Sequence, residues 1–173
     1  MEDRPDEMSV VENLRAHGLI IDGKDIQIPA DHFGLKTNKP FDQDLFDRHN
    51  NRGIQAWTEY LRRVCIYPNP DKFGPDIIVS AAMGGYYEVE VKTDWPGGPF
   101  PFPNLRIPYR KNRIALEYRP LLFVVLSNDL QRALTVPARR VLKSPVVGVD
   151  NEYLDNEPFF VIALTDTREV ILE

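Results

Sequence analysis

The chain has 173 residues, a length typical of one domain with its own hydrophobic core. Its formal net charge is −5 and its pI is about 5.3, which excludes a protein coated in basic surface, so any nucleic-acid contact must be local. The single cysteine, Cys65, excludes an internal disulfide and fits a reducing compartment. The acidic, polar start and the lack of a long apolar run predict a cytoplasmic protein.

The sequence divides into an N-terminal arm, residues 1–41, and a main domain, residues 42–173. Within the arm, residues 18–29 are typical of a small hairpin turned by Asp22-Gly23. Three roles stay open for the arm: docking on the main domain, contacting a substrate, or mediating a dimer.

The main domain opens with a predicted helix over residues 42–64, interrupted by a break at residues 50–53, where the sequence reads Asn-Asn-Arg-Gly. After the break, Ile54, Trp57 and Leu61 recur at helical spacing. We therefore expect one buried face on the second half of this helix.

Two apolar runs in the middle of the chain, residues 74–79 and 87–92, are predicted to be neighbouring strands joined by a Gly-Gly turn. Alternation along the second strand puts Glu88, Glu90 and Lys92 on one face. Asp76, at the start of the first strand, then faces this row. Carboxylates from two strands suit a hard divalent cation, and a neighbouring lysine can meet a phosphate or orient a water.

The segment Pro75-Asp76, thirteen residues, then Glu90-Val91-Lys92 resembles the signature of the PD-(D/E)XK nuclease superfamily. The resemblance covers about residues 53–136, and its specificity comes from the predicted strands, turn and flanking helices. It implies an α/β protein with a three-layer restriction-endonuclease-like core. In that core a central mixed β-sheet is flanked by helices in the order α-β-β-β-α-β, here with additions at both ends.

The resemblance also implies roles for individual residues. Asp76, Glu90 and the backbone carbonyl of Val91 would hold Mg²⁺ or Mn²⁺, as one ion or two, while Lys92 would position the nucleophile. In this family a helix before the first strand often adds an acid. Glu59 is the candidate by position, although it lies almost opposite the apolar face, and Asp47 is the alternative if the helix runs through the predicted break.

The implied activity is metal-dependent hydrolysis of phosphodiester bonds, with DNA as the expected substrate. The alternative is a nuclease-like module that binds nucleic acid or a partner with little turnover. RNA as a substrate and a homodimeric state both stay open.

The stretch after the second strand, residues 93–108, is rich in proline and aromatic residues and is predicted to be irregular. The preferred interpretation is that Trp95, Phe100 and Phe102 cover a gap in the core. The alternative is a stiff wall that stacks on unpaired bases.

A helix predicted over residues 109–118 carries the densest basic cluster of the chain. Its candidate contacts to nucleic acid, together with one residue just before it, are Arg106, Arg110, Lys111 and Arg113. A solvated helix face is the alternative for each of them.

The last third of the chain is predicted to contribute further strands, and those at its end are either added strands or a hairpin packed on the core. Buried strands are expected at residues 121–126, 132–136, 159–164 and 170–172, with a helical stretch after Pro137. Because the central strand near residues 77–79 is apolar on both faces, helices are expected on both faces of the sheet.

Overall fold

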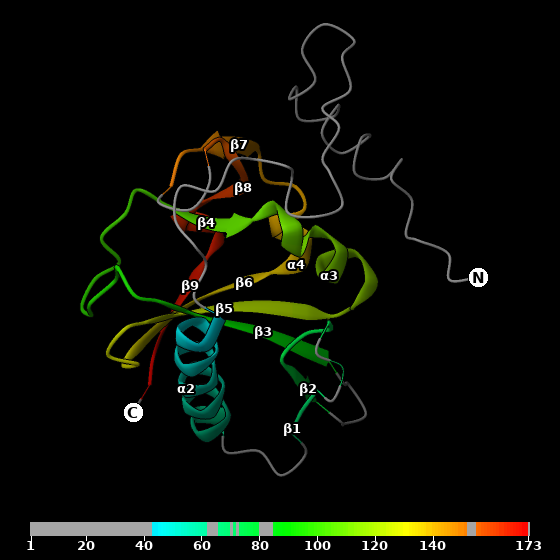
Figure 1. Cartoon of the computed structure of the whole chain (residues 1–173), viewed down its shortest axis with the longest axis vertical. Coiled ribbons are helices and arrows are strands. Elements are labelled where there is room, and N and C mark those ends of the chain that lie inside the picture. Colours follow the sequence, from blue (N-terminus) through cyan, green and yellow to red (C-terminus); the bar gives the residue numbers. More distant parts are fainter. Residues whose placement is uncertain are drawn as a thin grey trace, which may run out of the picture.

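The structure is a computed structural model that describes residues 43–61, 66–69, 71, 73–79, 85–151 and 155–172. This part of the chain contains two sheets (Figure 1). The larger has six strands in the order β1-β2-β3-β5-β6-β9, and the smaller has three in the order β4-β8-β7. The N-terminal arm, Cys65 and the turn at residues 80–84 lie outside the described residues.

The bounds of the elements are as follows. The larger sheet contains β1 (Ile66–Pro68), β2 (Ile77–Val79), β3 (Gly85–Lys92), β5 (Leu121–Ser127), β6 (Arg132–Pro137) and β9 (Arg168–Ile171). The smaller sheet contains β4 (Asn104–Pro108), β7 (Val146–Val149) and β8 (Glu157–Ala163). The helices are α2 (Gln43–Leu61), α3 (Asn112–Glu117) and α4 (Ala138–Val141), with 3₁₀ turns η2 (Tyr109–Lys111) and η3 (Leu164–Asp166).

The predicted α/β class with a mixed sheet is confirmed. Strands β3 and β5 are parallel, and the other neighbouring pairs of the larger sheet are antiparallel. The connection from β3 to β5 passes through β4, η2 and α3, whereas the predicted order placed only a helix there. Strand β4 was missed because its residues were assigned to the proline-rich irregular stretch. An edge strand tolerates the proline with which it ends.

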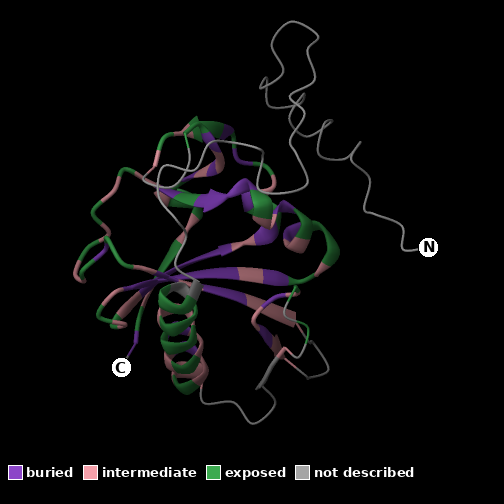
Figure 2. Cartoon of the chain, viewed as in Figure 1, coloured by how far each residue is buried: buried purple, intermediate pink, exposed green. Residues whose placement is uncertain are grey.

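The two faces of the larger sheet are covered differently. Helix α2 packs on one face, where Trp57 joins Val89 and Leu126 in a buried apolar cluster. The smaller sheet covers the other face together with α3 and α4 (Figures 1 and 2). The prediction of helices on both faces is therefore incomplete rather than wrong: on the second face α3 and α4 share the layer with the short apolar strands of the smaller sheet. Ile107 and Phe160 of these strands are fully buried against the larger sheet.

Helix α2 runs without interruption through residues 50–53, so the predicted break was wrong. Gly53 serves close packing there. A Cβ atom at this position would lie 2.6 Å from Val91 Cγ2 and 3.2 Å from Leu126 Cδ1. Glycine thus lets the helix axis approach the sheet more closely than any other residue would.

The C-terminal strands were predicted in part. Strands β5, β6, β8 and β9 occur close to their expected positions, and α4 follows Pro137. They do not extend one sheet, however: β9 pairs with β6 in the larger sheet, and β8 lies between β4 and β7 in the smaller one. Across the described ranges, no helix combines the length and the apolar character needed to cross a membrane.

Candidate active site

The candidate site is built on the antiparallel pair β2–β3, as predicted. Ile77 lies opposite Tyr87 and Val79 opposite Gly85. Asp76 directly precedes β2, and its Oδ2 accepts a hydrogen bond of 2.7 Å from the backbone N–H of Val89. Its Oδ1 accepts a longer one, 3.4 Å, from Nδ2 of Asn50 on α2. The Asp76 carboxylate is thereby fixed between the strand and the helix.

Two glutamates of β3 share this region with Asp76. Glu88 is buried, with only 5% of its surface exposed, and Glu90 is half-buried. Burial raises the pKa of Asp76, and the charge of Glu90 adds to that rise, while the Val89 N–H and Lys111 oppose it. Asp76, Glu88 and Glu90 together form the acidic centre of this protein.

Lys111, from η2, reaches the acidic centre. Its Nζ donates a hydrogen bond to Glu88 Oε1 and forms an ion pair with that carboxylate. Burial raises the pKa of Glu88 to about 7, although the Lys111 ammonium acts in the opposite direction. Burial lowers the pKa of Lys111, but the charges of Glu88 and Glu90 outweigh it and the net change is upward. We predicted Lys111 as a surface contact to nucleic acid, and the structure instead turns it inward.

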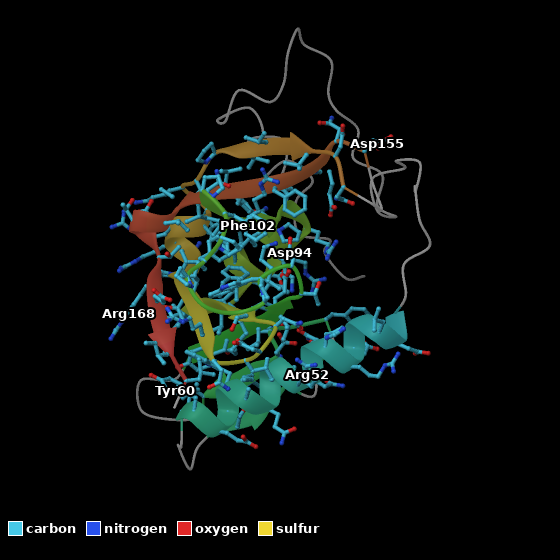
Figure 3. All side chains as sticks on the ribbon, turned by 90° about the vertical axis from the view of Figure 1, so that its left-hand side faces the viewer. Arg52, Tyr60, Asp94, Phe102, Asp155 and Arg168 are labelled. Atoms are coloured by element: carbon cyan, nitrogen blue, oxygen red, sulfur yellow. The ribbon has the colours of Figure 1, made fainter. Side chains whose placement is uncertain are left out.

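Lys92, the predicted catalytic lysine, lies on the predicted face of β3 but has other partners. Its Nζ is 3.0 Å from Asp94 Oδ1 and 4.8 Å from the centre of the Phe102 ring (Asp94 and Phe102 are labelled in Figure 3). These contacts direct the ammonium toward the loop after β3. One quarter of the Lys92 side chain is exposed, so it stands at the rim of the region rather than inside it.

The predicted helix acids do not join the centre. Glu59 is exposed on α2 and accepts a 3.0 Å hydrogen bond from Gln55, and Asp47 is exposed as well. Asn50 is the residue of α2 that reaches Asp76. In an unbroken helix Asn50 shares a face with Trp57, seven residues later. Because a break was predicted at residues 50–53, the sequence did not indicate that Asn50 lies on the face of α2 that meets the sheet.

The rest of the predicted basic cluster is spread over the surface. Arg110 pairs with Glu157 at 3.2 Å, Arg113 pairs with Glu117 at 3.1 Å, and Arg106 is exposed on β4. The Arg113–Glu117 pair lies on the surface, where such pairs contribute little free energy, so a phosphate can replace the carboxylate at small cost.

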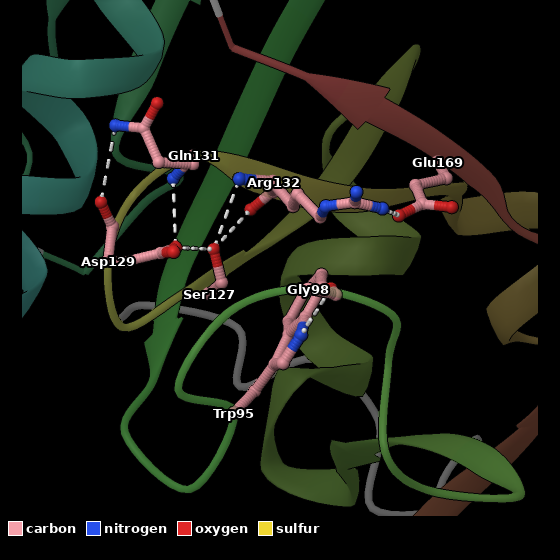
Figure 4. Close-up of polar contacts among 7 residues, drawn as sticks. All are labelled: Trp95, Gly98, Ser127, Asp129, Gln131, Arg132 and Glu169. Atoms are coloured by element: carbon pink, nitrogen blue, oxygen red, sulfur yellow. Dashed lines mark hydrogen bonds and ion pairs between the residues drawn. The ribbon is translucent and has the colours of Figure 1, made fainter.

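The loop after β3 supports the core-covering interpretation of its aromatic residues. Trp95 is fully buried, and its Nε1 donates a 3.1 Å hydrogen bond to the carbonyl of Gly98 (Figure 4). Phe100 packs edge-on against Trp95, and Phe102 against Phe100. The backbone N–H of Asn128 also binds the Trp95 carbonyl at 2.7 Å, which ties this loop to the β5–β6 turn. Trp95 is therefore a packing residue.

The acidic centre offers the donor chemistry of a hard cation. Asp76 and Glu90 supply carboxylate oxygens of the kind that Mg²⁺ prefers, and the Val91 carbonyl remains a predicted ligand. Glu88 Oε2 is buried and has no hydrogen-bond partner, an arrangement that native proteins seldom leave uncompensated. No group of three or more His, Cys, Asp or Glu side chains in the described ranges is arranged as a ready-made metal site. Asp76 and Glu90 are the carboxylates that would hold a hard cation if one binds here.

Comparisons of this chain with protein-family models, with curated proteins and with solved structures find no match. The functional argument therefore depends on the residues and on the geometry of the acidic centre.

Proposed function

We propose that this protein is a metal-dependent nuclease of the PD-(D/E)XK type that hydrolyses phosphodiester bonds of DNA. The observation that carries the proposal is the position of Asp76 beside β3, where its Oδ2 accepts a hydrogen bond from the Val89 N–H between Glu88 and Glu90, with the Lys111 ammonium paired to Glu88. Hard oxygen donors beside a fixed cation are the combination that phosphoryl transfer requires.

The order of the elements supports the fold part of this proposal. Helix α2 and three antiparallel strands are followed by α3 and by β5, which lies parallel to β3. This order is compatible with the restriction-endonuclease-like order with β4 inserted, which supports the proposal. The reducing, cytoplasmic setting expected from the sequence is part of the same proposal.

In this mechanism Asp76 and Glu90 would hold the metal ion, and the Val89 N–H and Asn50 orient Asp76. The chemistry that a bound divalent cation supplies is Lewis acidity toward the phosphate and a lowered pKa for a water. Lys111 places a fixed positive charge where negative charge develops on the phosphate. Lys92, at the rim, exchanges Asp94 for a neighbouring phosphate of the substrate.

The test is cleavage of supercoiled, linear, single-stranded and branched DNA with Mg²⁺, Mn²⁺ or EDTA. We expect cleavage with metal and none with EDTA. Asp76→Asn and Glu90→Gln should both abolish it, because each removes a ligand charge while keeping the shape of the side chain. Glu59→Gln is the matched control, since this exposed glutamate lies on α2 away from the centre, and it should cut like the wild type. Equal loss in all three variants would contradict the assignment.

One observation favours the alternative of a binding module. An ammonium already lies in the acidic centre, and Arg110 and Arg113 are already paired with acids of the same chain. Under this alternative the wild type binds labelled DNA equally well in Mg²⁺ and EDTA and cuts none of the four substrates. Metal-dependent cleavage by the wild type excludes it.

A further inference from the structure

Strand β7 forms an edge of the smaller sheet that is not protected against a further strand. In the described part of the chain, β7 pairs with β8 alone. Its sequence, Val-Val-Gly-Val, contains neither a charge nor a proline, and Val147 is 46% exposed. Natural proteins usually blunt such edges with charged residues or proline, because an open edge strand pairs with any other strand that reaches it. An uncharged edge therefore favours a further strand beside β7.

The three other sheet edges within the described ranges are blunted in this way. Strand β1 is only three residues long and ends in Pro68. Strand β9 exposes the charged side chains of Arg168 and Glu169. Strand β4 exposes Arg106 and ends in Pro108. The edge at β7 is thus the one that is open to pairing.

The backbone groups of β7 that face the open edge follow from its pairing with β8. Just before the ladder, the N–H of Val161 donates a 2.8 Å hydrogen bond to the carbonyl of Pro145. Hydrogen-bonded and non-hydrogen-bonded pairs alternate along an antiparallel ladder, so every second residue from Pro145 onward bonds to β8. The N–H and C=O groups of Val146 and Gly148 then point away from β8. Gly148 lies opposite Pro158, which has no N–H, in agreement with this alternation.

The N-terminal arm, which lies outside the described residues, contains a sequence that fits this edge. Residues 24–31 read Lys-Asp-Ile-Gln-Ile-Pro-Ala-Asp, and Ile26 and Ile28 alternate with polar residues as in a strand with one buried face. Residues 24–29 are the second half of the hairpin predicted over residues 18–29. A two-stranded hairpin is at best marginally stable in water and needs a third strand. The predicted strand therefore needs a neighbour, and β7 has an open edge.

One antiparallel register satisfies the backbone and the side chains of both segments. In this register Ile28 lies opposite Val146. Ile26 then lies opposite Gly148, so that the N–H groups of both isoleucines meet the outward backbone groups of β7. Both isoleucine side chains share the face of Val146, which is buried. Pro29 falls between hydrogen-bonded positions, where no N–H is needed.

The charges at the two ends match in the same register. Lys24 lies opposite Asp150, which follows β7 and is exposed. The Asp150 carboxylate is fixed at this end by a 2.7 Å hydrogen bond from the backbone N–H of Asn156. At the other end, Asp31 falls near Lys143, which is exposed and precedes β7. A shift of one residue would turn both isoleucines to the opposite face, so the register is well specified.

The arm is long enough to reach β7. It joins the described residues at Gln43, at the end of α2 that is nearer to the smaller sheet (Figures 1 and 3). Residues 32–42 span up to about 36 Å when extended. The radius of gyration of a domain of this size is about 14 Å. An edge of the smaller sheet is therefore within reach of residues 24–31.

We propose that residues 24–31 of the arm pair antiparallel with β7 of the same chain and add a strand to the smaller sheet. Of the three roles open to the arm, this selects docking on the main domain. A second copy of the chain fits the edge less well. In a two-fold pair of β7 strands centred on Val147, Asp150 would lie opposite Ser144, and no opposite charges would meet.

The experiment is disulfide formation in full-length chains that also carry Cys65→Ala, so that no native thiol interferes. In the proposed register Gln27 and Val147 form a non-hydrogen-bonded pair, whose Cα atoms lie about 4.5 Å apart and within disulfide range. Gln27→Cys/Val147→Cys should therefore form an intramolecular disulfide under mild oxidation, as measured by mass spectrometry. Gln27→Cys/Arg168→Cys, on the edge formed by β9, is the matched control and should stay reduced.

Equal disulfide yields in the two variants, or none in Gln27→Cys/Val147→Cys, would overturn the proposal. A disulfide-linked dimer of Val147→Cys alone would identify a second copy as the occupant and would overturn it as well.

Hydrogen exchange of the otherwise unaltered chain gives a second measurement. The amides of Val146 and Gly148 should be protected in the wild type and should lose this protection in Ile26→Lys/Ile28→Lys, because the two lysines cannot be buried against the smaller sheet. Gln27→Lys, on the outward face, is the matched control and should keep it. Rapid exchange of both amides in the wild type, or unchanged protection in Ile26→Lys/Ile28→Lys, would contradict the docking.

Discussion

The two faces of β3 differ in what they demand of their neighbours. On the α2 face, Val89 and Val91 pack against Trp57 and close to Gly53, and the contacts are apolar and tight. On the opposite face, Glu88 and Glu90 meet Lys111 from a segment that the smaller sheet holds. The first face is sensitive to volume and the second to charge. Strand β3 thus separates a packing surface from a polar centre. Substitutions on the packing side should destabilise the protein by changing volume, and those on the polar side by leaving a charge unpaired.

The largest expected effect on stability is on the charged face. Replacing Lys111 by Met leaves the buried Glu88 without its partner, and breaking a buried pair in this way costs about 3–5 kcal/mol of unfolding free energy. Glu88→Leu/Lys111→Met removes both charges and should recover most of that loss. Urea unfolding of the wild type, the single variant and the double variant measures it. A double variant no more stable than Lys111→Met would show that charge is not what this face is sensitive to.

The packing face should respond to a single methyl group. In Gly53→Ala the new Cβ meets Val91 Cγ2 at 2.6 Å, so overpacking should cost about 1–3 kcal/mol, less the gain in helix propensity of up to about 1 kcal/mol. Combining it with Val91→Ala gives the new methyl group room. A double-mutant cycle should then show favourable coupling of about 1 kcal/mol or more. Strict additivity of the two substitutions would contradict the close approach.

The smallest effect on stability is expected on the surface beyond the charged face. Arg113→Ala should change the fold little, because its pair with Glu117 is exposed, but the lost phosphate contact lowers the slope of log affinity against log salt. The slope for DNA binding should therefore fall by roughly 0.7–0.9. Arg139→Ala/Arg140→Ala, on α4, is the comparison and should keep the wild-type slope. A wild-type slope in the first variant and a lower slope in Arg139→Ala/Arg140→Ala would indicate that DNA binds at α4 instead.

The packing face was the easier of the two to predict from sequence. Val, Ile and Tyr residues predicted β2 and β3, and helical spacing predicted the Trp57 face of α2. Gly53 was misinterpreted because glycine inside a helix has two explanations, a break or a close approach, and only the position of Val91 distinguishes them.

On the charged face, the sequence predicted the residues that lie close together in the chain, within β3, but not the residue that comes from a distant segment. Alternation put Glu88 on the same face as Glu90, but it does not tell which glutamate is buried. Lys111 was assigned to the surface because its place depends on the pairing of β4 with β8, which joins residues more than fifty positions apart. No periodicity within one segment carries that information.

Strand β8 has a consequence for how the centre comes into being. Asp76, Glu88 and Glu90 all belong to the first 92 residues, whereas Glu157 and Phe160, which hold the segment of Lys111, come from the last tenth of the chain. A chain that stops before residue 157 contains every acid of the centre but leaves β4 without its β8 partner and Lys111 without its anchors. During synthesis the three acids are therefore made before the residues that fix Lys111 beside them. The acidic centre acquires its lysine only when β8 joins the fold.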